Sequence, residues 1–310
     1  MASLREVFSF GTNMETIESL RRKIETVEEL QSVVKTMKTI AMVSIRQYER
    51  AVQSLSEYDR TVTMGLQVVV QKQPPRVRQA PLSGTGRKVA AVILGSEQGM
   101  CGQFNEQMTA FALDKLSRAA GHPRDLAVIA VGGRVAARLE EAGQPIAQQF
   151  DLPGSAAGIT PRVQELLVKL EEMQDRGLVH RLLVFHHEPV HRAAYQPRER
   201  RLLPLDPGWL TELARARWPS RVLPTFTMEE DRLFFLLLGH YLFVSLFRAF
   251  AASLAAENAS RLAAMQAAES HIEDRLGELK LQFNDLRQNT ITEELLDIMV
   301  GFEAATGKKY

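Results

Sequence analysis

Proline is missing from both ends of this chain. All 13 prolines lie between Pro74 and Pro224, and most of the glycines lie in the same middle region. Proline breaks helix interiors and glycine weakens them, so this distribution predicts helical ends and a middle region that contains the turns. The sequence therefore divides into two helical arms and a central domain.

Cysteine and excess charge are also scarce. The single cysteine, Cys101, has no second cysteine for an internal disulfide, which favours a reducing compartment. The 38 lysines and arginines nearly balance the 37 aspartates and glutamates. Because this leaves no broad positive field, we expect no nucleic-acid partner. The segment Met1 to Gly11 lacks the basic-then-apolar layout of a signal peptide.

Long uninterrupted apolar runs are absent as well. The most apolar stretch, Leu233 to Phe250, is interrupted by Gly239, His240 and Arg248. Its unbroken runs fall far short of the ~20 residues that a membrane-spanning helix needs. A helix covered by protein on most of its circumference has the same composition. We therefore expect a buried helix here and no direct membrane span.

Apolar residues recur in steps of three and four along both arms. A heptad spacing sustained this long predicts a supercoiled seam between paired helices. We expect a helix from Glu15 to about Val70 and a longer one from about Met228 to Ala304. The seam residues are Ile17, Leu20, Ile24, Val27, Val34, Ala41, Ile45, Tyr48, Val52, Leu55, Val62, Leu66 and Val69, then Leu262, Met265, Ile272, Leu276, Leu279, Phe283 and Leu286.

Three further features of the arms stand out. Gln31, Lys38 and Asp59 interrupt the N-terminal register. The stretch from Ala249 to Ala268 is dense in alanine and serine, which predicts a close approach of backbones. Beyond Leu286 the apolar spacing shifts by one residue, so we expect the helix to change partner near there.

The middle of the chain alternates short apolar runs with helical patterns, which is typical of βαβ units and a mostly parallel sheet. The predicted fold is an α/β domain inserted between two long terminal helices that form an antiparallel coiled coil. The expected boundaries are 1–73 for the first helix, 86–206 for the domain, 207–226 for a linker and 227–310 for the last helix.

Three local motifs suggest chemistry, and each has a simpler interpretation. His187, Glu188 and His191 spell H-E-x-x-H, but Pro189 disfavours the helix that a zinc site of this kind requires. The glycine loop after residue 94 has neither of the usual phosphate-binding spacings. Cys101 has no neighbouring base or cation in sequence, so we expect a packed thiol. We predict no catalytic residue, metal or cofactor.

Three segments together resemble the γ subunit of F-type ATP synthases. Lys35 to Ala41 is similar to the family's K-A-M-x-M-V-A, and Ser96 to Asn105 is similar to S-D-R-G-L-C-G-x-x-N, with Glu97 and Gln98 in place of the usual acid and arginine. The third segment is similar to S-E-x-x-x-R-M-x-A-M and N-x-x-R-Q-x-x-I-T-x-E-L. It is carried by Glu257, Arg261, Met265, Ala268, Asn284, Arg287, Gln288, Ile291, Thr292, Glu294 and Leu295.

The resemblance implies a central-stalk rotor that couples ion flow to ATP chemistry without being an enzyme by itself. It implies as partners the α and β subunits of the catalytic hexamer, the ε subunit and the c-subunit ring. We expect a location on the cytoplasmic face of a bacterial plasma membrane, because no transit peptide is recognisable in the sequence. The residues expected to contact the hexamer are Met37, Lys38, Glu257, Arg261, Arg287, Gln288 and Thr292, and the domain's motif loop carries Gly99, Cys101, Gly102 and Asn105.

A different class of function is a non-rotary coiled-coil scaffold or adaptor. The arms alone leave this alternative open. The motif loop and the Arg287 to Leu295 segment favour the rotor, because a generic coiled coil has no reason to carry both.

Overall fold

A computed structural model describes residues 16–72, 88–119, 122–190, 195–219, 222 and 224–306. The chain forms two compact units. One comprises the residues up to Met37 together with those from Met265 onward, and the other runs from Lys38 to Ala264. Two long helices, α1 (Ile17–Ser54) and α7 (Glu230–Thr306), contribute to both units. The expected domain boundaries stay predictions.

The first unit is a pair of helices with an apolar seam. Leu20, Leu276 and Leu279 are almost fully buried, and burial recurs every three to four residues along both helices, as the heptad spacing predicts. Glu28 of α1 forms an ion pair with Lys280 of α7, with 2.8 Å between the carboxylate oxygen and Nζ. The sequence prediction of paired terminal helices is confirmed.

The N-terminal arm is not one continuous helix as predicted. Helix α1 ends at Ser54, and a second helix, α2 (Ser56–Lys72), begins after a turn at Leu55. Ser54 Oγ donates to the carbonyl of Ala51, which is the helical acceptor for the Leu55 amide. That amide donates to the carbonyl of Val52 instead. The serine hydroxyl thus competes with the helix backbone and interrupts it.

The second unit contains a five-stranded sheet of order β3-β2-β1-β4-β5. All neighbouring strands are parallel except β4 and β5, which are antiparallel. The mostly parallel sheet was predicted, whereas the three-residue β3 was not. The strands are β1 (Val89–Leu94), β2 (Leu126–Val131), β3 (Gln148–Phe150), β4 (Arg181–Pro189) and β5 (Tyr195–Leu203).

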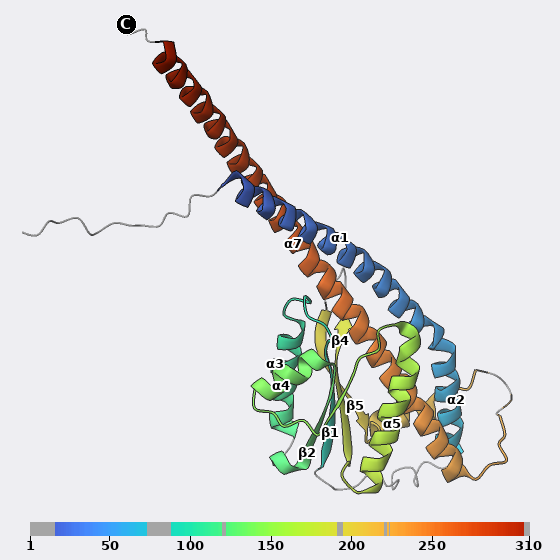
Figure 1. Cartoon of the computed structure of the whole chain (residues 1–310). Coiled ribbons are helices and arrows are strands. Elements are labelled where there is room, and N and C mark those ends of the chain that lie inside the picture. Colours follow the sequence, from blue (N-terminus) through green and yellow to red (C-terminus); the bar gives the residue numbers. More distant parts are fainter. Residues whose placement is uncertain are drawn as a thin grey trace, which may run out of the picture. The chain divides into compact units, whose positions relative to one another are not determined.

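Helices cover both faces of this sheet. Helices α3 (Phe104–Ala119) and α4 (Gly133–Glu141) lie on one face, and α5 (Ile159–Asp175) and the part of α7 in this unit lie on the other (Figure 1). Alternate residues of β1 enter the two resulting cores: Ala90, Val92 and Leu94 face α5 and α7, while Val89, Ala91 and Ile93 face α3 and α4.

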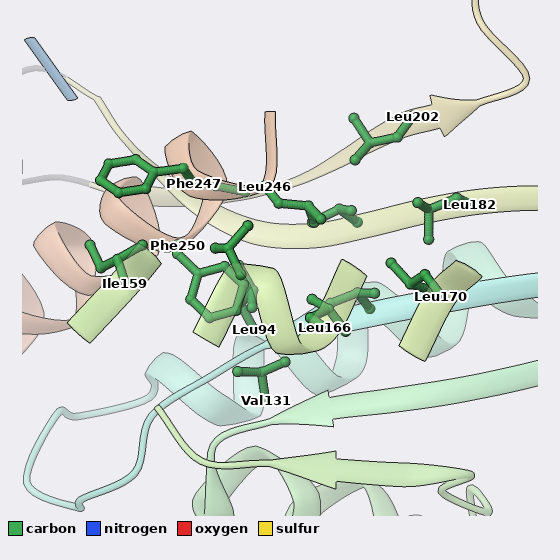
Figure 2. Close-up of a cluster of buried hydrophobic side chains, with 14 of the residues drawn as sticks. Leu94, Val131, Ile159, Leu166, Leu170, Leu182, Leu202, Leu246, Phe247 and Phe250 are labelled. Atoms are coloured by element: carbon green, nitrogen blue, oxygen red, sulfur yellow. The ribbon is translucent and has the colours of Figure 1, made fainter. Parts of the chain in front are cut away.

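The core between the sheet and α7 explains the apolar composition of this helix. Leu246, Phe247 and Phe250 of α7 pack among side chains of β1, β2 and α5, as Figure 2 shows. Within the described residues α7 is long and apolar enough to cross a membrane, with a mean hydropathy of 1.8 over its most apolar window, of which 44% is buried. Core helices of soluble proteins pass the same test.

The segment expected to be a linker contains a helix, α6 (Pro207–Arg215). Asp206 caps it by accepting a hydrogen bond from the amide of Gly208, and Pro207 occupies its first turn, where proline is tolerated. Trp209 stacks on Tyr241 of α7, with 5.1 Å between ring centroids. The proline-rich composition therefore marked a capped helix as well as turns.

Candidate functional site

The motif loop leaves the carboxyl end of β1 and enters α3. Its two ends are tied by side-chain hydrogen bonds: the Ser96 amide donates to Asn105 Oδ1 at 2.9 Å, and Asn105 Nδ2 donates to Ser96 Oγ at 2.8 Å. Both side chains are buried. Of the predicted loop residues, Asn105 therefore has a structural role in closing the loop.

Two glycines allow the loop to sit against its neighbours. A Cβ on Gly95 would lie 2.2 Å from Cβ of Val135, a distance that real atoms do not adopt. Gly102 has a φ of +57°, in the left-handed region that favours glycine. Met100 also has a positive φ of 60° and is 61% exposed. The path of the loop is thus set by close approach and by backbone conformation.

Glu97, one of the departures from the family pattern, holds the loop to neighbouring segments. Its Oε2 accepts hydrogen bonds from the amides of Gly133 and Leu152, each at 3.2 Å. Gly133 begins α4, where free amides favour a carboxylate. Glutamate therefore supplies an acid that links three segments at the carboxyl end of the sheet.

Cys101 is a packed thiol. Its side chain is buried, and Sγ lies 3.5 Å from Ser96 Oγ and 3.6 Å from Asn105 Nδ2. Burial raises the pKa of this thiol above its ordinary value. Because only the thiolate is a good nucleophile, this position does not favour covalent chemistry.

The loop is bonded to α7 through its backbone carbonyls. Ser260 Oγ donates to the carbonyl oxygen of Cys101 at 2.5 Å, and Arg261 Nη2 donates to that of Gly99 at 3.5 Å. The hydroxyl of Tyr195, at the start of β5, lies 2.8 Å from Ser260 Oγ. We call these five residues the loop–α7 joint.

A buried ion pair lies beside the joint. Arg261 Nη2 is 2.6 Å from Oε1 of Glu257, and their side chains are only 11% and 7% exposed. Burial raises the pKa of Glu257 and outweighs the lowering effect of Arg261. The hydroxyl of Tyr48 on α1 also has a raised pKa, first from burial and then from the charge of Glu257. The carboxylate and the guanidinium thus pair with each other within the chain, while Nε of Arg261 has no hydrogen-bond partner among the described residues.

The predicted hexamer contacts fall into three groups that differ in exposure. Glu257 and Arg261 are buried against the motif loop, so little of either side chain is accessible to another subunit. Arg287, Gln288 and Thr292 are exposed on α7. Met37 and Lys38 are half-buried on α1. Contact of all these residues with the hexamer stays a prediction.

Neither metal nor protease chemistry is assembled in the described residues. His187 and Glu188 lie in strand β4, as expected, and His191 lies outside the described part. His187 is fully buried, stacked on Phe104 with 4.0 Å between ring centroids, and Glu188 pairs with Arg198. Among the described residues, no group of three or more His, Cys, Asp or Glu could hold a metal ion.

Sequence reasoning missed Tyr195 and Ser260. They meet across 65 positions in the chain, so no local spacing connects them. The dense alanine and serine content of Ala249 to Ala268 was the available signal, and its prediction of close packing is confirmed by the full burial of Ala251, Ser253 and Ala256.

These features define a class of protein in which paired terminal helices carry an inserted α/β domain that is bonded to the longer helix. A family model described as ATP synthase matches residues 16–305. The chain therefore belongs to this family, the γ subunits of ATP synthase.

Solved structures with the same fold come from ATP synthases. A chain from the Euglena gracilis mitochondrial ATP synthase assembly of OSCP, F1 and c-ring is 17% identical, with a TM-score of 0.64 over 95% of this chain and 97% of that one. A chain from the rotor of the same enzyme is 15% identical, with a TM-score of 0.59 over 89% and 98%. A chain from the Tetrahymena thermophila central stalk and c-ring is 15% identical, with a TM-score of 0.55 over 76% and 99%.

Proposed function

We propose that this chain is the central-stalk rotor subunit of an F-type ATP synthase, coupling ion translocation through the membrane sector to ATP synthesis or hydrolysis in the α/β hexamer. The observation that carries this proposal is the family match over residues 16–305, together with the paired helices around an inserted α/β domain. The chain itself is a non-catalytic subunit of the complex.

The pairing of the helices suits a part that transmits force. Helices of this length are only marginally stable alone in water, so burial of the seam residues holds the pair together. Each fully buried large aliphatic side chain contributes about 1.5 to 3 kcal/mol. Leu276 and Leu279 are such residues. A supercoiled pair resists bending better than one helix does.

The C-terminal end of α7 supports contact with a larger partner. Beyond Leu286 the helix exposes a run of apolar side chains, from 45% for Ile291 to 69% for Phe302. Exposed apolar patches of this kind mark interaction sites. We assign this end, with Arg287, Gln288 and Thr292, to the α and β subunits. We assign the α/β domain to the ε subunit and the c-subunit ring, as the resemblance implies.

The proposal also covers the identity of the coupling ion and of the membrane on which the complex lies. The complex is associated with a membrane, and the chain is a peripheral protein on that membrane. We propose a proton or a sodium ion as the coupling ion. We propose the cytoplasmic face of a bacterial plasma membrane as the location, although the structures that this chain resembles include mitochondrial ones. Fractionation of the native cells, with and without detergent, tests the location.

A non-rotary scaffold is not favoured, because both the family match and the structural likeness extend over nearly the whole chain. The discriminating experiment is a mild-detergent pull-down of the tagged full chain from its native cells, with native mass and ATPase activity measured on the same eluate. We expect one copy with three copies each of two larger subunits and ATPase activity. Recovery of a free dimer, or of an unrelated partner without ATPase activity, would overturn the proposal.

A further inference from the structure

The α/β domain and α7 are held together by two kinds of contact. The core between them is formed by leucine and phenylalanine side chains such as Leu246 and Phe250. Apolar burial has no directional preference, so it resists separation better than it resists sliding or rotation. Hydrogen bonds weaken steeply when their angles change. The hydrogen bonds of the loop–α7 joint therefore add resistance to sliding and rotation, which the apolar core provides less well.

In the loop–α7 joint, two separate parts of the domain form hydrogen bonds with one short stretch of α7. The loop after β1 supplies the carbonyls of Gly99 and Cys101, and β5 supplies the hydroxyl of Tyr195. Because the single hydroxyl proton of Ser260 is donated to Cys101, the Tyr195 hydroxyl must donate to Ser260. The result is a series of two hydrogen bonds, donated from Tyr195 of β5 to Ser260 of α7 and from Ser260 to the loop.

Both ends of this series of hydrogen bonds are packed against other side chains. Tyr195 packs against Phe104 and His187, with ring centroids 5.5 and 5.1 Å away, and Cys101 packs with Phe104 and Ala256. The loop end is fixed by Asn105. Most of these contacts lie within the domain, so a turn of α7 relative to the domain would distort the hydrogen bonds of Ser260.

We infer that Tyr195 and Ser260 are positioning residues for torque transfer: they lock the α/β domain against rotation about α7, so that turning the domain turns the helix. This rests on the proposed rotor function and names where force passes from the domain into the helix. One hydrogen bond changes an equilibrium by about a factor of ten at most, so losing the Ser260 hydroxyl leaves the domain packed but less firmly locked.

The test compares variants of the full chain in the assembled complex, in sealed membrane vesicles with a membrane-potential dye. The quantity measured is the ATP-driven potential generated per ATP hydrolysed, which a purely structural role would not move. We expect Ser260→Ala, which removes two hydrogen bonds, to lower this ratio at least about twofold. Ser260→Thr keeps the hydroxyl and restores the ratio.

The matched control is Ser253→Ala, which removes a buried hydroxyl of α7 that has no hydrogen-bond partner in the described part of the chain. It should pump like the wild type. Should Ser260→Ala fail to assemble, Tyr195→Phe carries the test, because it removes one hydroxyl and keeps the packed ring. An unchanged ratio in the assembled variant overturns the inference. A wild-type chain that joins no ATPase complex overturns the rotor function instead.

Discussion

Two histidines on β4 are buried without charge. The pKa of His187 is lowered to about 3, first by burial and then by His186. The pKa of His186 is lowered to about 4, by burial and then by Arg200 and Arg198. The unfolded chain binds these protons near pH 6.5, so the folded state is favoured above that pH and loses stability as the pH falls toward 3.

His187→Phe should make the folded chain less sensitive to acid. Neither ring nitrogen of His187 has a hydrogen-bond partner in the described structure, so phenylalanine loses no bond there. Between pH 7 and pH 5 the variant should lose about 2 kcal/mol less unfolding free energy than the wild type. Urea titrations at both pH values measure this. His271→Phe, at an exposed position of α7, controls for the loss of a histidine, and equal losses in wild type and His187→Phe would refute the interpretation.

Gly95→Ala should destabilise the α/β domain. Its added methyl would lie 2.2 Å from Val135 Cβ and 2.8 Å from Asn105 Oδ1, which forces the loop or α4 to move. Overpacking of this kind costs about 1 to 3 kcal/mol. Gly154→Ala is the control, because nothing lies within 4 Å of its added atom. Thermal unfolding followed by circular dichroism compares the two, and similar melting temperatures would contradict the expectation.

At the scale of elements, the seam of the helix pair is the main source of stability in the first unit. Leu276→Asp buries a carboxylate where the wild type buries 93% of a leucine, and Ile24→Asp does so at a half-buried position of α1. We expect Leu276→Asp to cost at least about 2 kcal/mol. Leu281→Asp, at a 66% exposed position of the same helix, should cost little. Helicity against temperature tests this, and indistinguishable curves for the Leu276 and Leu281 variants would count against the seam.

How far the sequence predicts an element depends on whether its signal is local. The heptad seam was predicted from its periodicity, and the alternation of strands and helices from short apolar runs, because both signals lie in consecutive residues. The turn at Leu55 was not, because it depends on the hydroxyl of Ser54 taking a backbone acceptor. Asp59, which interrupts the seam pattern, proved to pair with Arg248 of α7 at 2.9 Å. The joint depends on partners far apart in sequence, so periodicity had no means of showing it.

At the scale of the whole molecule, the exposed end of α7 should matter to the complex more than to the chain. Arg287→Ala removes a side chain exposed to solvent, so the melting temperature of the isolated chain should not change. In the assembled synthase we expect ATP synthesis to fall about tenfold, as for loss of a hydrogen bond to a charged group. Arg275→Ala, which removes an exposed i,i+3 pair with Glu278 on the same helix, is the control. Wild-type synthesis rates in Arg287→Ala would remove this residue from the hexamer contact.

The acceptors in the loop–α7 joint are main-chain carbonyls, and every amino acid carries one. A substitution at position 99 or 101 that keeps the backbone path leaves those acceptors in place. The nearest heavy atom to a Cβ on Gly99 would be Nη2 of Arg134, at an ordinary contact distance of 3.7 Å. The loop can therefore accumulate side-chain changes without losing its attachment to α7. The side chain matters instead at the donors, Ser260 and Arg261. There, a single replacement by a residue without a donor group removes the hydrogen bond.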